Sequence, residues 1–209
     1  IDIPVYAERK AYWREAINNT IDYLITNSDF TDRRLLEFGI KQSILRHVAG
    51  GIDPYTIREA IAKRSDTRKQ YGIGPSDYLC VSCARFVPYK RTDFLIRSLA
   101  KCNATVTLLL AGDGPLEAEM KELANSQPYS IRFLGNLAQK DAVALIAAAD
   151  VYAQASTDLE KAVPGGSYIH TEGMGRSLLE SICSGVPVVV TNCGAVSEYI
   201  GAENGALVN

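Results

Sequence analysis

Two glutamates flank the start of a predicted helix and form the clearest chemical feature of the sequence. Glu172 and Glu180 stand eight positions apart in the segment EGMGRSLLE. If the helix is taken from Met174, eight residues rise about 12 Å, roughly the span from the ribose of a nucleoside diphosphate to a sugar on its far phosphate. A carboxylate at each end can accept hydrogen bonds from sugar hydroxyl groups. The spacing therefore permits a nucleotide-sugar site, while an ordinary solvated glutamate is the alternative at each position.

The helix start between these glutamates is suited to an anion. Its free N–H groups and dipole attract negative charge, and Gly173 and Gly175 leave the backbone open to a ligand. The two glycines could equally ease a tight turn into the helix. Arg176 falls in the first turn, where the dipole alone disfavours a cation, and a bound anion would offset that effect.

A second cationic segment follows the first strand of the predicted sheet. In ARFVPYKRTD, Arg85 and Lys90 lie on either side of Pro88. In a Rossmann-like strand order, 3-2-1-4-5-6, ligands bind outside the carboxyl ends of strands 1 and 4, and the segment that leads to Glu172 follows strand 4. The topology therefore brings both segments together and predicts a phosphate or diphosphate ligand, although Arg85 and Lys90 could also be ordinary surface charges.

Strands and helices alternate regularly through most of the chain. This pattern predicts an α/β fold with a Rossmann-like, doubly wound parallel sheet. The Gly/Pro-rich GIGPSD marks the predicted boundary before the sheet. Ahead of it we expect helices at 7–19, 29–39 and 56–72 with a strand at 22–28. Beyond it the predicted strands are 79–86, 105–112, 131–135, 150–156, 186–191 and 205–208, and the predicted helices are 92–102, 116–126, 139–149 and 174–184, with a short one near 195–201.

The composition excludes several classes of function. A net charge of -2 in 209 residues gives no electrostatic footprint for nucleic acid or an anionic membrane. No apolar run approaches the roughly 20 residues of a membrane span, and no signal peptide is evident. Five cysteines fit free thiols in a reducing cytoplasm. The Cys80–Cys83 pair lies within a predicted strand and has no partner pair at metal-ligand spacing, so we expect no metal there.

A nicotinamide-binding site fits the sequence poorly. The loop after the first predicted strand contains no glycine, so the dinucleotide fingerprint is missing from its usual place. The segment AGDGP (111–115) follows the second strand instead and lacks the third glycine.

Several segments, in this order and spacing, resemble the retaining, nucleotide-sugar-dependent glycosyltransferases of family 4 (glycosyl transferases group 1), which have the GT-B fold of two facing Rossmann-like domains. The resemblance covers most of residues 20–209, and GIDP (51–54) is similar to the interdomain NGxD stretch of the family. Glu172 and Glu180 match the two glutamates of its EX7E motif. The segments are CARFVPYKRTDFLIRSLA, LLLAGDGPLEAEMKELA, IRFLGNLAQKDAVALIAAADVYAQAS and EGMGRSLLESICSGVPVVVTNCGAVSEYI.

The resemblance implies a division of the chain and a set of partners. Residues 1–55 would be a remnant of the N-terminal, acceptor-side domain, 56–75 an interdomain linker or helix, and 76–209 a C-terminally truncated donor-binding domain. A UDP- or GDP-linked sugar would be the donor, and a hydroxyl of a glycan or a lipid-linked molecule the acceptor. The reaction would run in the cytoplasm or at the cytoplasmic face of the membrane, and any peripheral membrane contact would involve the N-terminal domain. This chain alone is expected to bind nucleotide without turnover.

The same resemblance implies a role for each candidate residue. Arg85 and Lys90 would bind the diphosphate and stabilise the leaving group, Glu172 would hold the donor sugar and Glu180 the ribose. Fixed cations and amides suffice for this stabilisation, so no metal and no cofactor are expected. The remaining donor-binding residues would be the phosphate cradle Gly173, Met174, Gly175, Arg176 and Ser177, and Leu137 against the base.

The sequence also departs from the family pattern. Gly50 stands where the family has Asn, and the short link between Ser156 and Glu172 is expanded to 15 residues. His170, at the end of this expansion, and His47 are expected to be structural. Two other functions stay open, a catalytically silent nucleotide-sugar-binding module and a GT-B-fold nucleotide-sugar epimerase.

Overall fold

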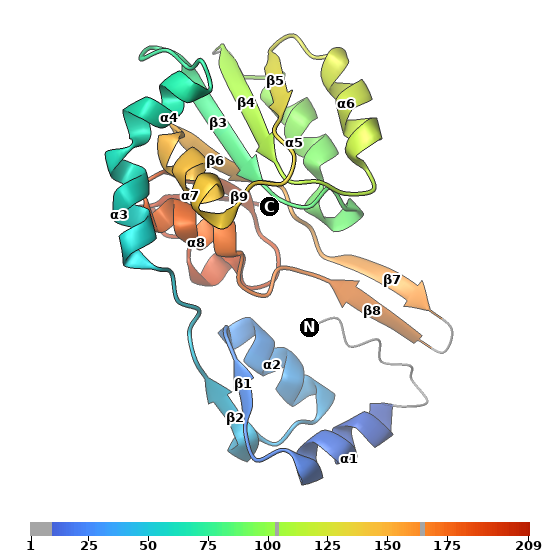
Figure 1. Ribbon diagram of the computed structural model, residues 1–209. Coiled ribbons are helices and arrows are strands. Elements are labelled where there is room, and N and C mark those ends of the chain that lie inside the picture. Colours follow the sequence, from blue (N-terminus) through green and yellow to red (C-terminus); the bar gives the residue numbers. More distant parts are fainter. Residues whose placement is uncertain (1–9, 103–104, 164–165) are drawn as a thin grey trace.

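The computed structural model describes residues 10–102, 105–163 and 166–209, and its centre is a six-stranded parallel sheet (Figure 1). The strand order is β10-β9-β6-β3-β4-β5. When β3 is counted as the first strand, this is the predicted 3-2-1-4-5-6 order, so the doubly wound fold is confirmed. The strands are β3 (Tyr78–Cys83), β4 (Val106–Ala111), β5 (Ser130–Phe133), β6 (Val151–Gln154), β9 (Val188–Thr191) and β10 (Gly205–Val208).

Alternate residues of each central strand pack against opposite helical layers. Leu79 and Val81 of β3 belong to the core that α7 and α8 complete, while Cys80 belongs to the core under α5 and α6. This two-sided burial explains why the strands read as continuous apolar runs. The helices around the sheet are α3 (Pro54–Ala62), α4 (Arg64–Gln70), α5 (Thr92–Leu99), α6 (Glu117–Asn125), α7 (Gln139–Ala148) and α8 (Arg176–Cys183).

The charged segment 56–72 forms two helices, where the sequence predicted one. The break falls at Lys63, and both α3 and α4 pack on α7. A partly buried ion-pair network holds them there: the Asp150 carboxylate accepts hydrogen bonds from Arg64 at 2.7 Å, from Arg68 at 3.0 Å and from the Leu79 amide at 2.8 Å. Arg68, which is 8% exposed, also donates to three backbone carbonyl groups, those of Ala148, Gly74 and Asp77.

A smaller N-terminal unit lies at the other end of α3 (Figure 1). Its two strands are parallel and pair Leu24 with Leu45, and its small core includes Leu35 and Ile40. His47 ends the second strand, and its Nδ1 lies 3.1 Å from Asp32 Oδ2. The elements of this unit are α1 (Lys10–Thr20), β1 (Leu24–Thr26), α2 (Asp29–Phe38), the 3-10 turn η2 (Gln42–Ile44) and β2 (Leu45–His47).

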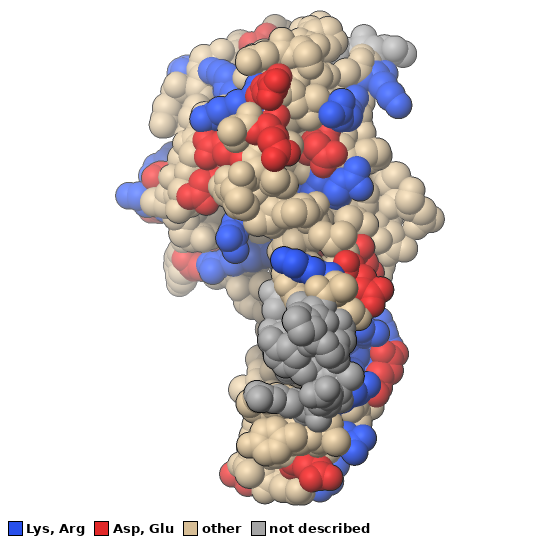
Figure 2. All heavy atoms as spheres, turned by 90° about the vertical axis from the view of Figure 1, so that its right-hand side faces the viewer, with Lys and Arg blue, Asp and Glu red and all other residues tan. Residues whose placement is uncertain are grey.

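The expanded segment between Ser156 and Glu172 forms an antiparallel hairpin that projects from the sheet unit (Figure 1). Its strands are β7 (Leu159–Val163) and β8 (Gly166–His170). Figure 2 shows basic and acidic side chains interspersed over one face of the molecule, with no large area of a single sign. None of the helices in the described ranges is long and apolar enough to cross a membrane.

Candidate functional site

The loops after β3 and β6 meet at the carboxyl edge of the sheet, as the topology predicted. Lys90 ends the 3-10 turn η3 (Pro88–Lys90) and its Nζ donates a hydrogen bond to Glu172 Oε1. Ser156 Oγ donates to the same oxygen at 2.6 Å. Glu172 is only 5% exposed, and the Lys90 side chain is 14% exposed. A carboxylate and an ammonium group are thus held together, largely out of water, at the switch point of the fold.

Glu180 is also buried, so neither glutamate is an ordinary solvated side chain. It is 4% exposed, and its Oε1 accepts hydrogen bonds from Arg176 Nε at 3.1 Å and from Gln139 Nε2. Burial raises the pKa of the Glu180 carboxyl above its usual value, although the Arg176 guanidinium and Gln139 partly offset this effect. Arg176 in the first turn is therefore already matched by a carboxylate one turn further along α8, before any ligand anion is considered.

This raised pKa predicts a pH-dependent cost of burying the Glu180 charge. Above both the folded and the unfolded pKa the buried carboxylate is ionised and destabilises the fold. Well below its ordinary pKa of 4.5 the carboxyl group is protonated in both states, and the cost disappears. Glu180→Gln should therefore gain stability relative to the wild type at pH 7, and this gain should shrink as the pH falls toward 4.5. Urea unfolding at both pH values measures the difference, and a gain that does not change with pH would contradict the explanation.

The helix that links the two glutamates is shorter than predicted. α8 begins at Arg176, and Gly175 at its N-cap has φ 71°, in the left-handed region that ends the helix on this side. The expected rise of about 12 Å between the glutamates is therefore wrong: only Arg176 to Glu180 is helical, a rise of about 6 Å. A Cβ on Gly173 would meet open space, so the local packing does not require glycine there.

Ser177 secures the first turn of α8 to the sheet. Its Oγ lies 2.8 Å from the hydroxyl of the buried Tyr152 and donates to the Cys83 carbonyl at 3.2 Å. Gln154, two residues after Tyr152 and 4% exposed, has a side-chain nitrogen without a hydrogen-bond partner in the described part of the chain. Tyr152, Gln154 and Ser156 were not among the predicted site residues, although polar side chains at alternate positions of the predicted strand 150–156 are a visible signal.

The remaining predicted site residues differ in their burial and in their contacts. Arg85 is exposed, and no described residue forms an ion pair or a side-chain hydrogen bond with its guanidinium group. Leu137 is partly buried against the core that α7 and α8 complete, and it lies two positions before Gln139, which contacts Glu180. Met174 approaches the segment between the two units so closely that a Cβ on Gly50 would lie 1.9 Å from the Met174 sulfur. This contact gives a steric reason for glycine where the family has Asn.

The base of the hairpin adds an aromatic cluster beside Lys90. The His170 ring stacks on Tyr89 with centroids 5.4 Å apart and planes 5° apart, and Tyr168 meets His170 edge-on at 4.8 Å. These contacts give His170 a packing role, as predicted for it.

The two cysteines of β3 are poor candidates for metal ligands. Burial raises the pKa of the Cys80 and Cys83 thiols to about 12, which makes them poor ligands at neutral pH. In the described ranges, the one set of three possible ligands within 4.8 Å of one another is Asp29, Asp32 and His47, in the N-terminal unit.

A hollow of about 360 Å³ lies between α5, α6 and the loop after β3. Its lining includes no member of the Lys90–Glu172 pair and no residue of α8, so we place the candidate site at the switch point instead. The lining residues are Phe86, Val87, Pro88, Arg91, Thr92, Asp93, Arg97, Leu116, Glu119, Met120 and Leu123.

Solved structures of known proteins share the fold of this chain. The Anabaena protein HepE, solved in complex with UDP and glucose, superimposes with a TM-score of 0.78 at 25% identity over 98% of this chain and 54% of that one. WaaG, a glycosyltransferase involved in lipopolysaccharide biosynthesis, superimposes with a TM-score of 0.74 at 21% identity, covering 95% of this chain and 52% of that one.

Several curated relatives are named as mannosyltransferases. A GDP-mannose-dependent monoacylated alpha-(1-6)-phosphatidylinositol monomannoside mannosyltransferase of Corynebacterium glutamicum is 29% identical over 92% of this chain and 50% of that protein. A GDP-mannose-dependent alpha-(1-6)-phosphatidylinositol dimannoside mannosyltransferase of Mycobacterium tuberculosis is 36% identical over 66% of this chain and 33% of that protein. The chain thus spans about half the length, or less, of these two relatives.

Residues 63–209 match the family described as glycosyl transferases group 1. The chain belongs to this family of GT-B glycosyltransferases.

Proposed function

We propose that this chain supplies the donor-binding half of a retaining, family 4 glycosyltransferase that moves a sugar from a GDP- or UDP-linked donor to a hydroxyl of a glycan or glycolipid. The observation that carries the proposal is the buried Lys90–Glu172 pair at the switch point. The GDP-mannose-dependent relatives favour a GDP-linked mannose, although HepE was solved with UDP. The free thiols fit a reducing cytoplasm as the site of the reaction.

The cations at this edge would neutralise the charge of the departing diphosphate. The Lys90 ammonium group has three N–H donors and uses one of them on Glu172 Oε1, the oxygen to which Ser156 Oγ also donates. The other Lys90 donors remain for a phosphate oxygen. Arg85 is exposed and has its whole guanidinium group available for a second phosphate contact. The backbone amides from Gly173 to Ser177 would add the donors of a helix start. Fixed groups of this kind stabilise developing negative charge without a metal.

The two glutamates would hold the two sugars of the donor. Among the described residues, nothing donates a hydrogen bond to Glu172 Oε2, so this oxygen can accept one from a hydroxyl of the transferred sugar. Glu180 would accept hydrogen bonds from the ribose hydroxyl groups. In the reaction, the bond between the anomeric carbon and the phosphate oxygen breaks, and the acceptor oxygen bonds to that carbon. Retention follows if the acceptor attacks from the side of the leaving diphosphate and passes its proton to the phosphate oxygen.

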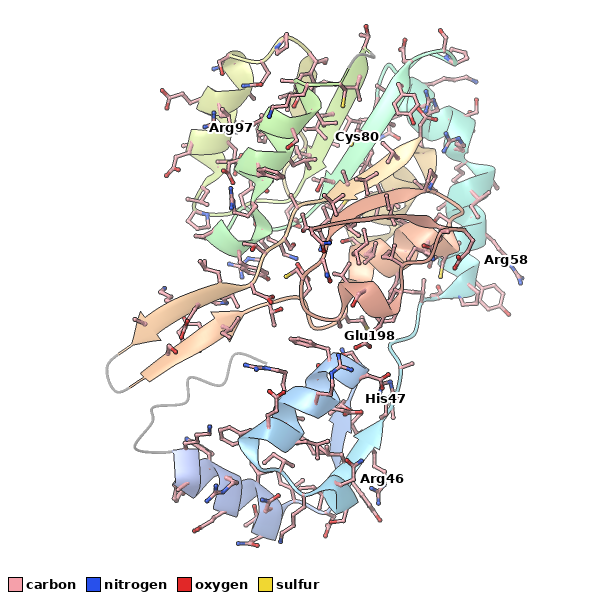
Figure 3. All side chains as sticks on the ribbon, turned by 180° about the vertical axis from the view of Figure 1, so that it is seen from behind. Arg46, His47, Arg58, Cys80, Arg97 and Glu198 are labelled. Atoms are coloured by element: carbon pink, nitrogen blue, oxygen red, sulfur yellow. The ribbon has the colours of Figure 1, made fainter. Side chains whose placement is uncertain are left out.

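Calorimetric titration with GDP and UDP tests the site. We expect saturable binding of the preferred nucleotide, and Arg85→Ala should weaken it about tenfold or more because one charge-assisted contact to phosphate is lost. Arg97→Ala is the matched control: Arg97 is exposed on α5, far from the loop after β6 in sequence, and its loss should leave the affinity unchanged (Figure 3). Absence of binding, or equal binding by both variants, would contradict the assignment.

An assay of turnover distinguishes sugar transfer from the two other functions, a nucleotide-sugar epimerase and a catalytically silent binding module. The assay needs a protein with both GT-B domains, because the relatives are about twice as long as this chain. Transfer from the donor that Glu172→Ala abolishes supports the proposal. Conversion of one nucleotide sugar into another without an acceptor indicates an epimerase, and binding without any turnover indicates a silent module.

A further inference from the structure

The carboxylate of Glu198 joins the sheet unit to the N-terminal unit. Glu198 ends the 3-10 turn η4 (Val196–Glu198) that follows β9. Its Oε2 accepts a hydrogen bond from the Asp29 amide at 3.0 Å, and its Oε1 accepts one from the Phe30 amide at 2.5 Å. Arg33 NH2 lies 3.8 Å from the same Oε1. Figure 3 places Glu198 at the junction between the two units.

This contact fits the electrostatics of the first turn of α2. The first amides of a helix have no intrahelical acceptor, and the N-cap Ser28 satisfies just one of them, the Thr31 amide, at 3.2 Å. Glu198 satisfies the Asp29 and Phe30 amides and places its negative charge at the positive end of the helix dipole. Its side chain is 20% exposed, so the charge is only partly screened by water.

The neighbouring residue makes a second contact with the same turn. The Tyr199 hydroxyl donates to the Asn27 carbonyl at 3.2 Å. Two consecutive residues after β9 therefore hold the chain on both sides of Ser28, which fixes the orientation of α2 as well as its distance from the sheet unit.

The segment that carries Glu198 is also tied to Glu172. The Ala195 amide donates to the Glu172 carbonyl at 2.8 Å. Gly194 has φ 56°, and a Cβ on it would lie 2.2 Å from the Glu172 carbonyl oxygen, so only glycine permits this approach. A shift of Glu198 therefore cannot occur without displacing the backbone of Glu172 or breaking this contact.

We propose that Glu198 is a positioning residue that sets the N-terminal unit relative to Glu172 and hence the acceptor relative to the donor sugar. The inference rests on the proposed function for its catalytic consequence, but the contact itself is independent of it. Loss of the Glu198 carboxylate should leave the affinity for nucleotide unchanged, because none of its contacts involves the loop after β3 or α8. Loss of the Glu198 carboxylate should lower the rate of transfer to an acceptor, because the N-terminal unit is no longer held in one orientation relative to the sheet unit.

Amide hydrogen exchange tests the contact directly on this chain. In Glu198→Ala, hydrogen exchange at the Asp29 and Phe30 amides should accelerate about tenfold or more, because each loses a charge-assisted hydrogen bond. Exchange at the Thr31 amide should not change, because this amide keeps its Ser28 acceptor. Ser28→Ala should give the opposite pattern, with acceleration at Thr31. Glu203→Ala, which removes an exposed glutamate of the same segment, should change none of these amides. Unchanged exchange at Asp29 and Phe30 in Glu198→Ala would overturn the proposal.

The catalytic part is tested in a protein with both GT-B domains. Glu198→Ala should lower kcat/KM for the acceptor at least tenfold, while the calorimetric Kd for nucleotide stays within twofold of the wild-type value. Glu198→Asp should have an intermediate kcat/KM, because aspartate keeps the charge but its side chain is shorter. Equal transfer by wild type and Glu198→Ala, or a parallel loss of nucleotide affinity, would overturn the positioning role. If no nucleotide binds to the wild type, the proposed function fails while the exchange result still decides the contact.

Discussion

Replacing Lys90 by methionine is expected to lower the free energy of unfolding by about 3–5 kcal/mol, the usual cost of breaking a buried ion pair from one side. Methionine fills a similar volume but leaves the Glu172 carboxylate, 5% exposed, with a single hydroxyl donor from Ser156. Urea unfolding monitored by circular dichroism measures the loss. The same substitution should remove nucleotide binding, because an ammonium group would no longer face the diphosphate.

Two further variants make this prediction specific. In Lys90→Met with Glu172→Gln neither charge remains, so most of the lost stability should return. Lys121→Met removes a lysine of the same type from an exposed pair with Glu117, 2.7 Å apart, and should cost about 0.5 kcal/mol or less. A loss in Lys90→Met no larger than that in Lys121→Met would show that the pair is not effectively buried.

Asp150→Ala is the second substitution expected to have a large effect, again about 3–5 kcal/mol. Asp150 is the shared acceptor of Arg64, Arg68 and the Leu79 amide, so its loss leaves a nearly buried guanidinium group without a counter-charge. α4 should then separate from α7 more readily, and thermal unfolding should begin several degrees lower.

The matched control is an exposed aspartate on the same helix pair. Asp66 is paired with Lys69 at 3.7 Å, and both side chains are more than three-quarters exposed. Asp66→Ala should therefore change the unfolding free energy by about 0.5 kcal/mol or less. Similar losses in the two variants would contradict the structural role of the Asp150 network.

The sheet order and the meeting of the two loops were predictable because each depends on a strong local signal. Apolar runs such as LLL at 108–110 can be buried only between two helical layers, and the carboxyl ends of parallel strands share one edge. These rules predict that the loop with Arg85 and Lys90 meets the segment that leads to Glu172, but they do not predict the ion pair between Lys90 and Glu172.

Contacts that join distant segments were not predictable in the same way. Sequence periodicity does not reveal that Glu198 caps the helix beginning at Asp29, because the two lie 169 positions apart. The start of α8 was misplaced because the helical pattern continues back through Met174, while the left-handed backbone of Gly175 interrupts it. The hairpin was missed because its strands are short and mostly exposed, so burial imposes little pattern on them.

The most direct test of the central claim is where a nucleoside diphosphate binds on this chain. We predict that titration with GDP or UDP, followed by amide chemical-shift mapping, perturbs the amides of Lys90, Gly173, Gly175 and Ser177 together, at the carboxyl edge of the sheet. Shift changes confined to the hollow between α5 and α6, at Arg97 and Glu119, would contradict the account.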